Sequence, residues 1–347
     1  MKKFKPVVLL AALLFVVTLM IPTFVVLPFG EEKVSGQLGE DVKEAAAQPK
    51  KEEAAATATA PSIDVAVYRT AKQDVESIPL EEYVAGVVAS EMPADFEKEA
   101  LKAQALTART YIVKQLMSDQ SVELPKDANV ADTEFFQVYK SQEELKKVWG
   151  PSDFSWKMEK INEAVRETQG KILTYDGVPI DATFFSTSNG YTESSEAIWP
   201  NSLPYLKSVE SPWDKQSPKY SGQKIITVKD FEAKLGVKLS NNKTIGEVTQ
   251  RTEGKRVAKV TINGKEVSGK DIRDKLGLMS TDFTWERRGD NIVINTKGYG
   301  HGVGMSQYGA NGMAKEGKPY TDIVQYYYQG VQIADAEPFI TTITAKK

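Results

Sequence analysis

The apolar positions of the chain begin with one continuous run at residues 7–27, which has no charged side chain and follows three lysines. This run is long enough to cross a bilayer as one helix, and the lysines before it favour a cytoplasmic N-terminus. A cleaved signal peptide is the alternative, although its apolar segment is typically shorter and a small-residue cleavage site follows closely. We therefore expect a transmembrane helix within residues 1–30.

Residues 31–62, which come next, are mainly Glu, Ala, Lys, Gln and Pro. Few large apolar side chains are available here to offset the entropy of ordering the chain, and this predicts a flexible linker. The pattern changes at Ile63, because apolar and polar residues then alternate over 64–68, as is typical of a strand. Ordered structure is therefore expected from residue 63 onward.

A helix is predicted directly after Pro79, because apolar residues from Leu80 to Val88 recur at helical spacing. It should end at Met92, since the residue before a proline is disfavoured in helical geometry. A second helix is predicted over about residues 97–115. Its many alanines let neighbouring elements approach closely, which favours a central position in the fold.

Further elements follow along the chain. A third helix should stop at Gly170, and strands at 172–175 and 178–185 flank the turn Asp176-Gly177. The more charged residues 214–290 carry their own predicted helix, at 228–235, and strands, and are expected to form an inserted arm. We predict an α+β fold of mixed helices and antiparallel strands. Its core comprises residues 63–213 and 291–340, with the smaller arm inserted and one transmembrane helix in front.

Composition narrows the chemistry that this fold can carry. The 347-residue chain has a formal net charge of −3, no cysteine and one histidine, His301. Without cysteine there is no disulfide and no thiol nucleophile, and a catalytic zinc site normally needs three protein ligands. The slight negative charge also gives no sign of a nucleic-acid partner. We therefore predict no metal ion, no cofactor and no nucleic-acid binding.

Glu91 is the first candidate for catalysis. It lies at the break between the first two helices, among Val87, Val88, Met92 and Pro93. Apolar surroundings raise the pKa of a carboxyl group, which suits a general acid. The alternative is an ordinary solvated carboxylate at a helix end, and the local pattern alone favours that interpretation because such residues are common.

The second helix carries Gln104 and Arg109. An arginine in a packed, alanine-rich helix needs a partner, which is either a ligand or a buried carboxylate. Spacing alone favours the buried carboxylate.

Two further segments are rich in polar side chains or glycine. Residues 184–192 join an apolar strand to a turn with hydroxyls and an amide, which suits a sugar site and equally an ordinary turn. Residues 298–309 contain many glycines around His301, which favours a role in lining a site. Neither segment contains a phosphate-binding loop or the Gly-x-Ser-x-Gly elbow of a serine hydrolase.

Taken together and in this order, several segments resemble the stage II sporulation protein D family of endospore-forming bacteria. The resemblance covers residues 63 to about 333 and is carried by the segments 78–84, 90–93, 99–105, 108–111, 204–206, 298–310 and 326–330.

This resemblance implies a peptidoglycan lytic transglycosylase, which cuts between N-acetylmuramic acid and N-acetylglucosamine and leaves a 1,6-anhydro end. The catalytic glutamate of the family falls on Glu91. The residues expected to hold the glycan are Gln104, Arg109, Ser188, Tyr205, His301, Ser306, Gln307 and Tyr327. A non-catalytic glycan-binding enhancer of an amidase, and a lysozyme-type hydrolase, remain the alternatives.

The resemblance also implies partners and a place in the cell. The expected partners are peptide-free glycan strands, the amidase stage II sporulation protein P and the membrane protein stage II sporulation protein M. The expected location is a single-pass protein of the mother-cell membrane, with its C-terminal domain in the septal space and a role in engulfment. Some relatives bind zinc at a His-Cys pair where this chain has Phe135-Phe136. We predict apolar packing there instead of a metal.

Overall fold

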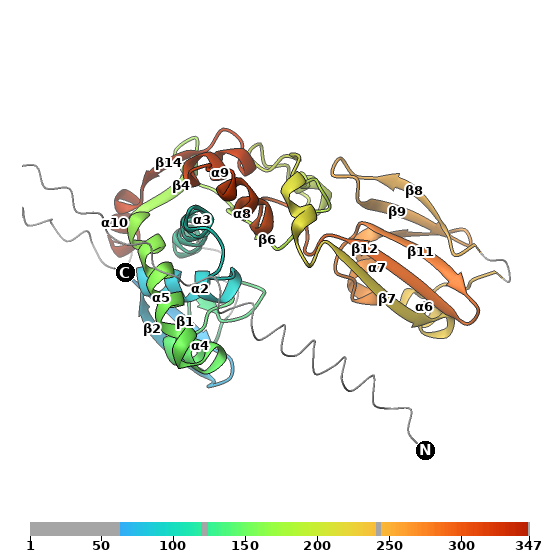
Figure 1. Ribbon diagram of the computed structural model, residues 1–347, viewed down its shortest axis with the longest axis horizontal. Helices are drawn as coiled ribbons and strands as arrows, with labels where there is room; N and C mark the ends of the chain where they lie inside the picture. The colour runs from blue at the N-terminus through green and yellow to red at the C-terminus, as the bar shows by residue number, and fades with distance from the viewer. Residues whose placement is uncertain (1–62, 119–123, 241–243, 346–347) are drawn as a thin grey trace, which may run out of the picture. The chain divides into compact units, whose positions relative to one another are not determined.

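The computed structural model describes residues 63–118, 124–240 and 244–345 (Figure 1). The predicted transmembrane helix and the predicted linker lie outside these residues. Within the described ranges, no helix is both long and apolar enough to cross a membrane. The spanning helix of the predicted fold class and the predicted single-pass location therefore find no support among the described residues.

The described chain begins with a hairpin. Strand β1 (Asp64–Arg69) pairs antiparallel with β2 (Asp74–Pro79), and β3 (Val130–Ala131) joins β1 in parallel. Helix α2 (Leu80–Glu91) follows at once and ends where Met92 turns to extended geometry in front of Pro93. The predicted helix and its predicted end are therefore confirmed, and Glu91 becomes the last residue of the helix.

Helix α3 (Lys98–Met117) lies at the centre of the first hydrophobic cluster (Figure 1). Its alanines at positions 100, 103, 105 and 108 are fully buried. The absence of larger side chains lets other elements pack closely against its backbone. These neighbours include α2, α5 (Pro151–Glu167), α8 (Gln307–Lys315), α9 (Tyr320–Tyr327) and α10 (Glu337–Ala345). Helix α4 (Gln142–Trp149) packs on α5 and α2.

Two small sheets complete this part of the fold. Strand β4 (Lys171–Tyr175) pairs with β5 (Val178–Pro179) and with β14 (Gln332–Asp335). The predicted hairpin strand at 178–185 was too long, since its last residues form β6 (Phe184–Phe185), which pairs in parallel with β13 (Met305–Ser306). Proline has no N–H for a strand ladder, so Pro179 is a natural end for β5.

The arm has a hydrophobic cluster of its own. One sheet has the order β11 (Phe283–Arg288), β12 (Asn291–Lys297), β7 (Ser221–Thr227), and the other joins β8 (Glu247–Arg251), β9 (Val257–Ile262) and β10 (Lys265–Ser268). Helices α6 (Val228–Leu235) and α7 (Gly269–Leu276) pack on each other. Strand β12, which the sequence placed in the core, is the central strand of the first arm sheet.

Candidate functional site

Glu91 lies on the wall of an open cavity of about 330 Å³. Its carboxyl oxygen Oε1 accepts a hydrogen bond from the backbone N–H of Val138 at 2.9 Å. The cavity is also lined by Trp149 of α4, Lys157 of α5 and Lys219. Elements far apart in sequence therefore converge on a cavity that Glu91 borders.

The environment of Glu91 changes its acidity. Burial raises the pKa of the Glu91 carboxyl group, while the Val138 N–H and the charge of Lys140 act in the opposite direction. A raised pKa keeps a carboxyl protonated closer to neutral pH, as a general acid requires. The Val138 N–H stabilises the same group when it is deprotonated, so both protonation states have a structural basis.

Gln307, the first residue of α8, connects α2 to α3. Its Nε2 donates to the backbone carbonyl of Glu91 at 3.0 Å and to Oε1 of Gln104 at 3.4 Å. Gln104 is fully buried, and its own Nε2 has no partner within the described part of the chain. The structure thus brings together three residues that the sequence singled out, namely Glu91, Gln104 and Gln307.

A buried carboxylate, Asp214, organises the segment directly before Gln307. Its two oxygens accept hydrogen bonds from the hydroxyls of Ser188, Ser211 and Ser306 at 2.8, 2.5 and 2.5 Å, and from the backbone N–H of Ser188 at 2.8 Å. Burial raises the pKa of Asp214, and these donors oppose that rise. The Ser306 hydroxyl also accepts from the Gly309 N–H and so caps α8. Ser188 and Ser306 therefore fix the start of α8 through Asp214.

Two predicted tyrosines are packed inside the fold. The hydroxyl of Tyr327, which is fully buried, lies 2.7 Å from the Ser211 hydroxyl. The Tyr205 hydroxyl accepts from the Asp181 N–H at 3.1 Å and donates to the Asp181 carboxylate at 3.3 Å. Neither tyrosine is among the residues that line the Glu91 cavity.

Arg109 is fully buried and bonded to the protein itself. Its guanidinium donates to the Glu81 carboxylate, with the shortest contact at 2.6 Å, and to the carbonyls of Val165, Thr168 and Lys171. These contacts join α3 to α2, α5 and β4. Of the two partners that the sequence allowed, the structure shows a carboxylate, and the predicted glycan contact of Arg109 finds no support in this geometry.

His301 lies apart from the residues that line the Glu91 cavity. Its ring packs against the rings of Phe185 and Trp199, with both centroid distances at 5.7 Å, and its Nδ1 accepts from the Val303 N–H at 3.1 Å. Burial, followed by the charge of Arg256, lowers the pKa of His301 to about 4. The imidazole is therefore neutral at neutral pH, and it serves here as a packed ring.

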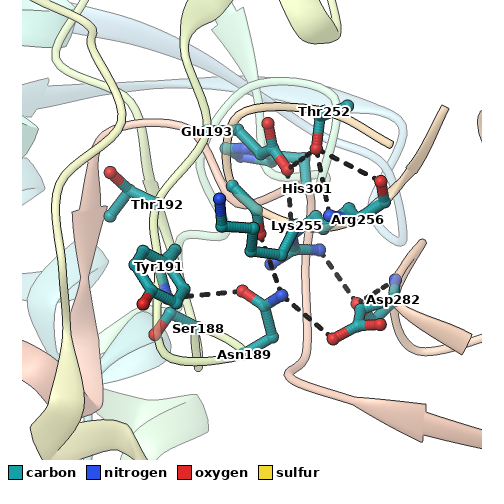
Figure 2. Close-up of polar contacts among 12 residues, drawn as sticks. Ser188, Asn189, Tyr191, Thr192, Glu193, Thr252, Lys255, Arg256, Asp282 and His301 are labelled. Atoms are coloured by element: carbon teal, nitrogen blue, oxygen red, sulfur yellow. Dashed lines mark hydrogen bonds and ion pairs between the residues drawn. The ribbon is translucent and has the colours of Figure 1, made fainter. Parts of the chain in front are cut away.

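A network of polar residues joins the arm to the core beside His301 (Figure 2). The Asn189 amide donates to the carbonyl of Gly254 and to the Asp282 carboxylate, each at 3.0 Å. The Thr252 hydroxyl donates to the buried carboxylate of Glu193 at 2.6 Å. Asn189, in the segment that suggested a sugar site, thus contacts the arm.

The prediction of apolar packing at Phe135-Phe136, where some relatives bind zinc, was correct in part. Phe136 packs against the hydrophobic core, whereas Phe135 is 73% exposed and touches Phe136 edge-on. The expectation of apolar packing was therefore correct for Phe136 and wrong for Phe135. No group of acidic or histidine side chains with the geometry of a metal site occurs among the residues that the structure describes. The absence of zinc stays a prediction.

Several residues of this site gave no signal in the sequence. The Val138 donor is a backbone group. Three side chains of the cavity lie in segments without a motif, namely Trp149, Lys157 and Lys219. Asp214 looked like one of many carboxylates at the start of the arm. Only its complete burial distinguishes it.

Comparison with known proteins identifies the family. A family model described as "Stage II sporulation protein" matches residues 68–175, the part that contains Glu91. The chain is 57% identical to stage II sporulation protein D of Bacillus subtilis (strain 168) over 329 residues, which is 95% of this chain and 96% of that protein. It is 54% identical to the protein of that name from Bacillus amyloliquefaciens, over 99% and 100% of the two chains.

A more distant relative has a different name from these two proteins. The amidase enhancer of Bacillus subtilis (strain 168) is 30% identical over 303 residues, which cover 72% of this chain and 40% of that protein. The two nearly full-length matches decide the assignment. The chain belongs to the stage II sporulation protein D family, as its sequence motifs indicated, and has a role in sporulation.

Proposed function

We propose that this protein is a peptidoglycan lytic transglycosylase that cuts peptide-free glycan strands between N-acetylmuramic acid and N-acetylglucosamine. The observation that carries the proposal is the Glu91 carboxyl group, which combines a raised pKa, one backbone donor and an adjoining open cavity. One carboxyl that serves first as acid and then as base is sufficient for this reaction.

In the first step, protonated Glu91 gives its proton to the glycosidic oxygen as the bond from C1 of N-acetylmuramic acid breaks. The acetamido group of the same sugar shields the positive charge that develops at C1. In the second step, the Glu91 carboxylate takes the proton of the C6 hydroxyl, whose oxygen bonds to C1. The 1,6-anhydro ring forms without water, and Glu91 returns to its protonated state.

The surrounding residues support these two steps. The Val138 N–H stabilises the carboxylate between them, and Gln307 holds the backbone carbonyl of Glu91 in place. Trp149 and Lys219 border the space where a sugar would lie. Gln104 and Asp214 act indirectly. Gln104 positions Gln307, and Asp214 positions the start of α8.

The products of cleavage test this proposal. The full chain is incubated with peptide-free glycan strands, and the fragments are weighed. Anhydro ends, one water lighter than hydrolysed ends, are expected from the wild type and from Glu82→Gln, which changes an exposed glutamate of the same helix. Glu91→Gln should give none. Hydrolysed ends, or cleavage that survives Glu91→Gln, would defeat the proposal.

A lysozyme-type hydrolase is a second candidate, because Asp95 lines the same cavity as Glu91. Such a hydrolase uses a second carboxylate, either as the nucleophile of a retaining reaction or as the base that activates water in an inverting one. It would yield hydrolysed ends and lose activity in Asp95→Asn. A lytic transglycosylase keeps both its activity and its anhydro ends in that variant.

A non-catalytic enhancer is the third candidate, and the 30% identity to an amidase enhancer favours it. It would leave glycan strands intact and raise the rate of a wall amidase added to them. The partners that belong to the proposal are an amidase, stage II sporulation protein P, and the membrane protein stage II sporulation protein M. Pull-down of the purified proteins with wild type and Glu91→Gln would show whether binding is independent of cleavage.

A further inference from the structure

The arm contains a cleft of about 700 Å³, separate from the Glu91 cavity. It is bordered by strands β7, β8, β11 and β12 and by the turn between β8 and β9. Sites for small ligands commonly have volumes of roughly 300–1,000 Å³, so this cleft has the size of a binding site. Nothing in the proposed reaction makes use of it.

The charges that line this cleft are mostly positive. Arg251, Lys255 and Lys297 face a single carboxylate, that of Asp282, which leaves an excess of two positive charges. The whole chain, by contrast, has a net charge of −3. A local cationic surface on an acidic chain attracts anionic ligands selectively.

Most of this positive charge is available to a ligand. Asp282 already accepts from the Asn189 amide (Figure 2). Its ion-pair partner is Arg251, at 3.6 Å. Lys255 and Lys297 are exposed and have no carboxylate partner within the ranges that the structure describes. Lys255 lies over the ring of Tyr191 at 5.9 Å. Two ammonium groups are thus free to meet an anion.

The uncharged part of the lining suits sugars. Ser221, Gln223, Thr284 and Asn295 present hydroxyl and amide groups, and the Gln223 amide donates to Asn295 at 2.9 Å. All four side chains are exposed. Such groups exchange hydrogen bonds with water and sugar hydroxyls equally well. The cleft therefore has donors and acceptors for a polyhydroxylated chain as well as positive charge for an acid.

The chain itself connects the cleft to the Glu91 cavity. Ser221 and Lys297, which are paired in the sheet, line the cleft, and two residues before Ser221 comes Lys219, which lines the cavity. Two residues beyond Lys297 is Tyr299, which is 41% exposed and has the Lys219 ammonium 5.2 Å from its ring centre. Cations and one exposed aromatic ring thus follow each other from the cleft to the cavity.

We infer that this cleft is a second binding site for the glycan strand and that it recognises the lactyl carboxylates of N-acetylmuramic acid. The inference rests on the proposed function for the identity of the polymer. In a strand without peptides, each lactyl group ends in a free carboxylate, whereas in a peptide-bearing strand that carboxylate is an uncharged amide. Lys255 and Lys297 would therefore favour peptide-free strands, while Glu91 acts further along the same chain.

Binding by the full chain tests this inference, with Glu91→Gln present throughout to block cleavage. Three hexasaccharides of equal length serve as probes: a peptide-free muramyl oligomer, the same oligomer with its lactyl groups converted to amides, and an oligomer of N-acetylglucosamine. The variant Lys255→Ala/Lys297→Ala is compared with Lys234→Ala/Lys275→Ala, which removes two exposed charges of the arm outside the cleft.

The carboxylate form should bind more tightly than the other two probes, and the cleft variant should lose about tenfold in affinity for it alone, the effect of two exposed ion pairs. Its affinity should also lose most of its dependence on salt. The Lys234/Lys275 control should bind like the parent. Equal binding of all three probes, or equal losses in the two double variants, would overturn the inference, as would tighter binding of poly(glycerol phosphate) or of an acidic peptide at the cleft.

The binding experiment and the cleavage assay together distinguish the inference about the cleft from the catalytic proposal. If the wild type cuts no strand but still binds the carboxylate form through Lys255 and Lys297, the proposed chemistry fails and the second site stands. If the wild type produces anhydro ends while the cleft variant binds the carboxylate form normally, the proposed chemistry stands and the second site fails.

Discussion

Gly86 in the middle of α2 allows the segment that serves Glu91 to pass close to the helix. A Cβ atom at this position would lie 2.3 Å from the ring of Tyr139 and 2.8 Å from the carbonyl oxygen of Lys140. The Tyr139 ring has little room to move away. It stacks on the Tyr83 ring, with 5.5 Å between the ring centres, and the Arg69 guanidinium lies 5.0 Å from the centre of the Tyr139 ring. Gly86→Ala must therefore displace the Tyr139 segment.

The size of this effect comes from two opposing contributions. Overpacking of a buried site costs about 1–3 kcal/mol. Alanine in place of a helical glycine stabilises by about 1 kcal/mol. Carbon atoms make contact at roughly 3.5–4.0 Å, so a separation of 2.3 Å is a severe overlap and the first contribution dominates. If this overlap costs about 2–3 kcal/mol, in the upper part of the overpacking range, the net loss in the free energy of unfolding is about 1–2 kcal/mol.

The displacement should also reach the catalytic group, because Val138 immediately precedes Tyr139. Loss of the Val138 N–H removes a contact that lowers the pKa of Glu91, so this pKa should rise further. The cleavage step needs protonated Glu91. The alkaline limb of the pH–rate profile should therefore move to higher pH in Gly86→Ala, while the maximal rate falls.

Urea unfolding and a pH–rate profile measure the two effects, and a double-mutant cycle with Tyr139→Ala tests their cause. Without the ring, the cost of Gly86→Ala should shrink, since the closest contact is gone. The reasoning is refuted if Gly86→Ala is as stable as the wild type, or more stable, as helix propensity alone would make it. It is also refuted if the cost is unchanged in the Tyr139→Ala background.

Three further substitutions test other parts of the site. Asp214→Asn should destabilise by about 1–3 kcal/mol for each serine hydroxyl left without an acceptor, measured by urea unfolding; an unchanged midpoint would rule out the buried network. Glu91→Gln should gain stability relative to the wild type as pH rises above 4.5. The raised pKa means that the folded state binds the proton more tightly, so the ionised carboxyl destabilises the fold at high pH and not at low pH. A pH-independent difference between the two proteins would contradict this. Arg109→Met should lose about 3 kcal/mol, and the paired variant Arg109→Met/Glu81→Met less, because the second change removes the uncompensated carboxylate. Thermal unfolding compares them, and equal losses would exclude the ion pair.

Local sequence patterns predicted the elements that are set by their own residues. Helix α6 lies at the predicted residues, and α2 ends where Pro93 excludes helical geometry. Errors arose where partners decide the structure. Phe184 and Phe185 continue the apolar run after Pro179, yet they leave that hairpin because β13 offers them a parallel partner more than a hundred residues away. The glycine-rich segment likewise changes into helix α8 at Gln307, where a capping serine is available.

For the site, the sequence determined the chemical groups, and the tertiary structure decided which of them meet. An apolar neighbourhood at a helix end made Glu91 a candidate and predicted the direction of its pKa shift, because both follow from residues adjacent in the chain. Its expected catalytic role came from the family resemblance, since the local pattern alone favoured an ordinary solvated carboxylate. Ser188, Ser306 and Tyr327 were selected through the family resemblance, but only the fold shows that the two serines donate to Asp214 and that Tyr327 contacts Ser211 beside it. Long-range contacts of this kind leave no periodic trace, since a hydroxyl in a turn has the same local pattern whether its partner is a ligand or a buried carboxylate.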